Sequence, residues 1–77
     1  MTKNEMVETL ISDFEKLDTA IENGIIPHYN RHDELMKIYY NRQDCFIIGA
    51  GLMAQLWDKA SHDYSIKKCG WSPKRQF

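Results

Sequence analysis

Apolar side chains recur every three or four residues through the first third of the chain, the spacing of one face of an α-helix. Thr2 and Glu5 fit a capping box at its start. Asn23-Gly24 fits a left-handed stop at its end, and Pro27 follows shortly after. The pattern predicts a helix over about 3–23. Its apolar positions are Met6, Val7, Leu10, Ile11, Phe14, Leu17 and Ile21.

A second helical pattern covers about 31–64 and keeps one phase across the small residues at 49–51. At 100° per residue, its main apolar positions on both sides of these residues fall within about 60° of arc. We therefore predict one long helix, either straight or kinked at 49–51, that pairs with the first as a helical hairpin in an all-α fold. A full break at 49–51, giving a monomeric three-helix bundle, is the alternative. The apolar positions are Leu35, Tyr39, Phe46, Met53, Trp57, Ala60 and Tyr64.

The predicted long helix exceeds its partner in length. About 34 residues extend about 50 Å, whereas the first helix extends about 30 Å. Apolar side chains beyond that length would have no partner within the chain, so we expect the protein to self-associate as a homo-oligomer. The residues expected in this contact are Phe46, Ile47, Ile48, Leu52, Met53, Leu56 and Trp57.

The net charge of −1 conceals an uneven distribution along the 77 residues. Residues 1–24 carry six acidic and two basic side chains, a net charge of −4. Residues 65–77 carry four basic side chains and no acidic ones, a net charge of +4. The two regions can pair within one chain or between chains, or attract different partners. The length suits one domain, and we predict a helical domain over 1–64 and an irregular basic tail over 65–77.

The tail mixes basic side chains with large aromatic ones. Such a mixture suits contact with nucleic acid, anchoring in a groove of a partner protein, or packing on the chain's own helices. An isoelectric point near 6.3 disfavours a dedicated nucleic-acid binder. We expect a protein partner that contacts the acidic face of the first helix and the tail. This contact set is Glu8, Glu15, Asp18, Lys67, Lys68, Trp71, Lys74, Arg75 and Phe77.

Three short motifs could carry chemistry, and each lacks its required context. Residues 49–54 match the dinucleotide fingerprint G-x-G-x-x-A, but the parallel strands of that fold are missing from the pattern. His28 and His32 have metal-ligand spacing, but His28 is expected before the helix and His62 lies far along it. Residues 61–63 are Ser-His-Asp, yet neighbours on a helix point about 100° apart. We expect no enzyme activity, no cofactor and no metal site.

Location follows from apolar content and cysteine use. The apolar run over 45–57 is too short to span a bilayer, and residues 1–5 contain no apolar core of a signal peptide. Cys45 and Cys69 form no disulfide framework at their spacing. We expect a cytoplasmic protein without membrane contact.

A capped helix over 2–24, an apolar helical stretch over 45–54 and the lack of a catalytic set resemble, as a class, small all-helical accessory proteins that phages use against host machinery and immune systems. The resemblance implies an anti-defence inhibitor or adaptor that acts by binding. Such a protein covers a host protein's working surface or sequesters a nucleotide signal between subunits. Candidates for the second role are Tyr39, Tyr40, Arg42, Lys67 and Lys68. A binder of a small ligand or metal and a nucleic-acid-binding regulator are the alternatives.

Overall fold

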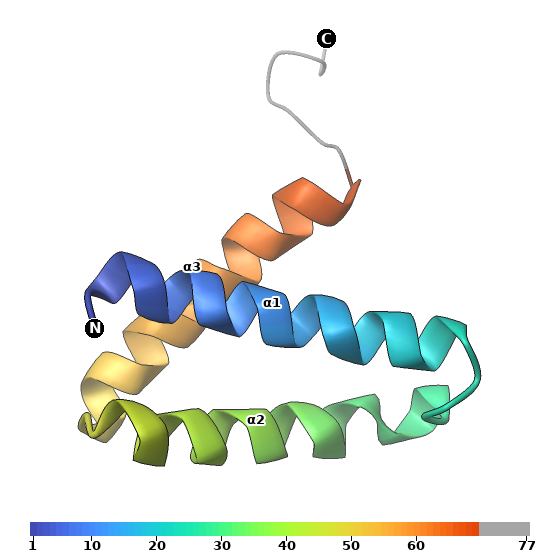
Figure 1. The fold of residues 1–77 in the computed structure, drawn as a ribbon, viewed down its shortest axis with the longest axis horizontal. Helices are drawn as coiled ribbons and strands as arrows, with labels where there is room; N and C mark the ends of the chain where they lie inside the picture. Colours follow the sequence, from blue (N-terminus) through green and yellow to red (C-terminus); the bar gives the residue numbers. More distant parts are fainter. Residues whose placement is uncertain (70–77) are drawn as a thin grey trace, which may run out of the picture.

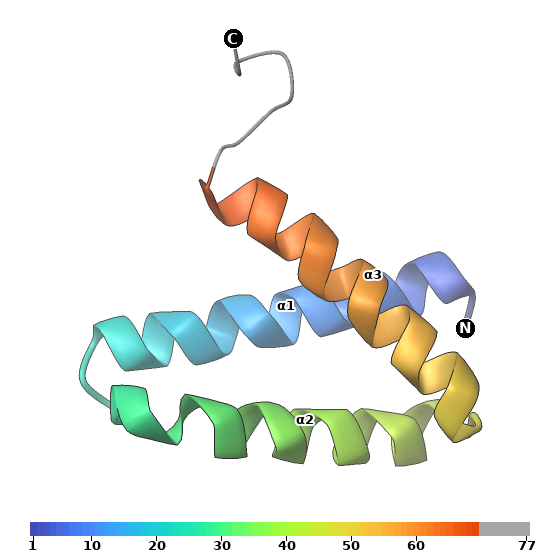
Figure 2. The same cartoon turned by 180° about the vertical axis from the view of Figure 1, so that it is seen from behind.

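The computed structural model describes residues 1–69, which form three α-helices and no strand. The helices are α1 (Lys3–Glu22), α2 (Arg31–Phe46) and α3 (Ala50–Cys69), and a 3-10 turn (His28–Asn30) precedes α2. α1 and α2 run side by side in opposite directions, and α3 crosses α1 obliquely on one face of this pair (Figures 1 and 2). The prediction of an all-α fold is confirmed.

Local sequence signals set both ends of α1. The Thr2 hydroxyl accepts a hydrogen bond from the Glu5 amide at 3.1 Å, and the Glu5 carboxylate accepts one from the Thr2 amide at 2.8 Å. This is the predicted capping box. After the helix, Gly24 adopts a left-handed φ of 76°, which glycine does without steric cost. The predicted range of about 3–23 therefore agrees with the structure to within one residue.

The predicted continuous helix over 31–64 is wrong, because the chain reverses at residues 47–49. α2 ends where Ile47 takes a left-handed conformation, with φ 56° and ψ 53°, and its amide donates to the Gln43 carbonyl at 3.0 Å. α3 begins at Ala50. The alternative with a break has the right number of helices, but the connection covers residues 47–49 and not 49–51. The apolar positions on both sides of 49–51 share one phase even though the helix is interrupted, because α2 and α3 each turn an apolar face toward α1.

The end of the last helix was also predicted too early. α3 continues through residues 65–69, which were assigned to the irregular tail. Two lysines in its last turn reach carboxylates of α1, and cations near a helix C-terminus also interact favourably with the helix dipole. The rest of the predicted tail, with Trp71, Lys74, Arg75 and Phe77, lies outside the described residues.

The hydrophobic core lies between α1 and α3. Leu10 of α1 and Met53 of α3 are both fully enclosed, with 0% of their surface exposed. α2 contributes only partly buried side chains to the edge of this core. The buried members are Met6, Val7, Leu10, Phe14, Met53, Leu56, Ala60 and Tyr64.

Candidate functional site

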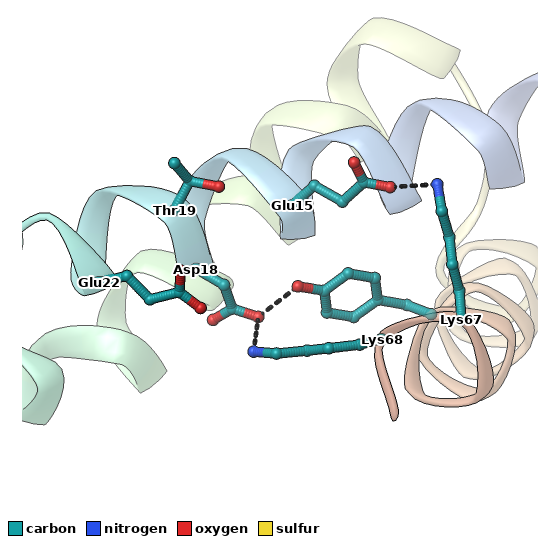
Figure 3. Close-up of a pocket in the computed structure, with 7 residues that line it drawn as sticks. Glu15, Asp18, Thr19, Glu22, Lys67 and Lys68 are labelled. Atoms are coloured by element: carbon teal, nitrogen blue, oxygen red, sulfur yellow. Dashed lines mark hydrogen bonds and ion pairs between the residues drawn. The ribbon is translucent and has the colours of Figure 1, made fainter. Parts of the chain in front are cut away.

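A buried carboxylate joins all three helices. Asp18 on α1 is only 6% exposed, and it accepts hydrogen bonds from Arg31 Nε at 2.9 Å, Tyr64 Oη at 2.5 Å and Lys68 Nζ at 3.1 Å. Arg31 opens α2, while Tyr64 and Lys68 lie on α3. Figure 3 shows Asp18 and Lys68 pointing toward each other across the junction. We call these four residues the Asp18 cluster.

The charges of the Asp18 cluster fix its protonation states. Burial alone would raise the pKa of Asp18, but the hydrogen bonds from Arg31, Tyr64 and Lys68 outweigh it and hold that pKa well below the usual range. Burial, and then the hydrogen bond to Asp18, raise the pKa of Tyr64 far above its usual value. Proton transfer requires a pKa near the working pH. The cluster therefore suits a structural junction.

Four residues of the predicted partner-binding set come together at this junction. Glu15 pairs with Lys67 at 2.5 Å, beside the contact between Asp18 and Lys68 (Figure 3). In the described part of the chain, the acidic and basic regions therefore pair with each other within one chain, which was one of the predicted alternatives. Glu8 is exposed on α1. The four tail members of the set, at 71, 74, 75 and 77, lie beyond the described part of the chain.

The predicted self-association residues are divided between core and surface. Met53 and Leu56 belong to the core of a single chain, with 0% and 4% of their surface exposed. Contacts within one chain already bury these two side chains, so their apolar character is no longer evidence for self-association. Ile47 is 89% exposed. The remaining members are partly buried, namely Phe46, Ile48, Leu52 and Trp57.

A row of aromatic rings leads from the core to the surface of α2. The Phe14 and Trp57 ring centroids lie 4.9 Å apart, those of Trp57 and Tyr39 5.1 Å, and those of Tyr39 and Tyr40 5.5 Å. Edge-to-face pairs of this kind are favourable. Tyr40 ends the row with 62% of its surface exposed. The core thus positions an exposed tyrosine.

Tyr40 stands on the solvent-facing side of α2, which buries no residue. At 100° per residue, four residues fall within about 80° of arc on that side, and we call them the outer face: Asp33, Met36, Tyr40 and Asp44. Sequence reasoning named Tyr40 only as a nucleotide-binding candidate. The missed signal was an aromatic side chain in phase with the polar positions of the helix.

The other motifs take no ligand-binding arrangement in the described part of the chain. Residues 31–46, which precede the glycines of the G-x-G motif, form α2 and not a strand. No group of three or more His, Cys, Asp and Glu side chains is placed to hold a metal ion within residues 1–69. His28, His32 and His62 are all exposed.

None of the helices described here combines the length and the apolar character needed to cross a membrane. Comparison of the chain with protein-family models, with curated proteins and with solved structures finds no match.

Proposed function

We propose that this chain is a non-enzymatic helical protein that binds a protein partner through the outer face of α2 and acts as an inhibitor or adaptor. The observation that carries the proposal is Tyr40, a large aromatic side chain that is 62% exposed and yet held by Tyr39. Tyrosine is among the residues that most often dominate binding energy at protein interfaces.

Rigidity adds to this argument. Binding immobilises side chains, which costs about 0.5–1.5 kcal/mol for each flexible one. Tyr39 supports Tyr40 and is itself packed against Trp57, which reaches the core. Part of the ordering cost is therefore met when the chain folds, and more of the contact energy becomes available for binding.

The alternatives with nucleic acid or a nucleotide receive less support. Lys67 and Lys68 were candidates for phosphate contact, and both pair with carboxylates of α1. Each of these two lysines therefore already has a carboxylate partner within the chain. Self-association and a role against a host defence system stay predictions.

A photo-crosslinking amino acid at position 40 tests the proposal, with the same group at the exposed position Lys16 of α1 as the matched control. We expect position 40, and not position 16, to crosslink one discrete protein in the native cellular setting. With that protein purified, Tyr40→Ser should weaken binding at least tenfold, which equals about 1.4 kcal/mol, while the helical content stays unchanged.

Native mass spectrometry of the gently purified chain supplies the opposing outcome. A complex with a nucleotide or nucleic acid in place of a protein would contradict the proposal. Equal crosslinking from positions 40 and 16 would contradict the assignment to the outer face.

A further inference from the structure

The charges on the outer face of α2 indicate what kind of partner fits it, an inference that rests on the proposed function. Asp33 and Asp44 are both exposed, and neither forms an ion pair within the described residues. The lysine and arginine residues of α2 each form an ion pair within the chain. Lys37 pairs with Glu34 at 3.2 Å, Arg42 with Asp13 at 2.6 Å, and Arg31 with Asp18 at 2.9 Å. The outer face therefore carries two carboxylates whose negative charge no lysine or arginine of the described residues offsets.

The spacing of these carboxylates matches a helical segment. They are eleven residues apart in the chain, or three helical turns and about 16 Å along the axis. Tyr40, which is exposed, and Met36, which is partly buried, lie between them on the same side of α2. An apolar strip with an acidic group at each end is the complement of an amphipathic helix that carries basic groups about three turns apart.

Two further large apolar side chains are exposed next to the ends of α2. Tyr29, just before α2, is 85% exposed, and Ile47, just after it, is 89% exposed. Large apolar groups in these positions contribute little to the core of the chain. They offer additional apolar surface near a partner that lies along α2.

The same charges disfavour a second copy of this chain as the occupant. Antiparallel pairing of two outer faces, centred between Met36 and Tyr40, places Asp33 of one copy opposite Asp44 of the other. Parallel pairing places each carboxylate opposite its own counterpart. Like charges facing each other in a partly desolvated contact are unfavourable, and phosphate groups would be repelled for the same reason.

We propose that the outer face of α2 docks a basic amphipathic helix of a partner protein. Apolar residues spaced three and four apart on that helix pack against Tyr40 and Met36. Lysine or arginine residues about eleven positions apart pair with Asp33 and Asp44.

A peptide-display selection from an unbiased library of about 20-residue sequences, with the full chain as bait, tests this. We expect the enriched peptides to carry a net positive charge and apolar residues at helical spacing. Tyr40→Ser should weaken their binding at least tenfold, and Asp33→Asn or Asp44→Asn several-fold. Asp58→Asn, which removes an exposed carboxylate from α3, is the matched control and should change affinity less than twofold.

Charge reversal sharpens the test, because Asp44→Lys should shift the enriched peptides toward acidic sequences. Enriched peptides without positive charge that still require Tyr40 would overturn the basic helix and leave the proposed protein-binding function intact. Peptides that bind Tyr40→Ser as well as the parent chain, or a selection without enrichment, would overturn the docking site. A homodimer that Tyr40→Ser dissociates would overturn the choice of occupant.

Discussion

α1 and α2 are neighbouring antiparallel helices, yet they bury very different amounts of themselves. α1 buries six residues, including Leu10 and Phe14, whereas α2 buries none. The difference arises from position, because α1 is covered by α2 along one side and by α3 across another (Figure 2). α2 packs against α1 and meets α3 mainly near the turn that joins them.

Two helices of one small domain can thus serve different purposes. α1 organises the fold, both through its apolar face and through Asp18. α2 contacts the rest of the domain through partly buried side chains, such as Leu35 and Ile38, that pack against the core. The ion pair between Arg42 and Asp13 also joins it to α1. The outer face of α2 therefore stays exposed, and substitutions on it can change binding without disturbing the hydrophobic core.

Truncation in the core of α1 is the strongest test of this contrast. Leu10→Ala should lower the free energy of unfolding by about 2–5 kcal/mol, because it leaves a cavity at a fully buried site. Met36→Ala on the outer face of α2 should lower it by about 1 kcal/mol or less. Urea unfolding followed by circular dichroism measures both. Equal losses would contradict the division of roles between the two helices.

Removal of the buried charge comes next in size. Asp18→Asn should lower the free energy of unfolding by about 2–3 kcal/mol, since hydrogen bonds to a charged group are lost. Asp13→Asn breaks the more exposed pair with Arg42 and should lower it by about 1 kcal/mol. Chemical denaturation at pH 7 distinguishes the two variants.

The pH dependence of stability follows from the direction of the pKa shift of Asp18. That pKa is lower in the folded chain than the usual value of about 3.9. As the pH falls, the carboxylate of Asp18 is therefore protonated in the unfolded chain before it is protonated in the folded chain. The contribution is therefore complete above about pH 5 and is lost as the pH falls through 4 and below. Below about pH 5, the free energy of unfolding of the parent chain should fall more steeply with falling pH than that of Asp18→Asn. Identical slopes would show that the cluster does not stabilise the fold.

The smallest expected effect is a gain in stability at the end of α2. A left-handed conformation costs a residue with a Cβ atom roughly 1–2 kcal/mol, and glycine avoids that cost but loses about 0.5–1 kcal/mol in entropy. Ile47→Gly should therefore stabilise the chain by about 0.5–1 kcal/mol, because its exposed side chain contributes little packing. Ile47→Ala keeps the Cβ atom and is the control. A loss of stability in Ile47→Gly would mean that Ile47 contributes to the fold.

The sequence alone determined the features that depend on neighbouring residues. The capping box at Thr2, the left-handed Gly24 and the apolar period through Leu10 and Phe14 are local, so the all-α class and the bounds of α1 could be predicted. The acidic and basic regions were also visible in the sequence. Their pairing was one of several alternatives, because charge along a chain does not say which groups meet.

Only the tertiary structure decided where the chain reverses and which faces stay open. The left-handed residue of the break is Ile47, which disfavours that conformation, although Gly49 lies in the same connection. Packing of α2 and α3 against the same helix outweighs this local cost. Packing also buries Met53 and leaves Tyr40 at the surface. Periodicity shows that a helix has an apolar face, but only the arrangement of its neighbours determines how much of that face is covered.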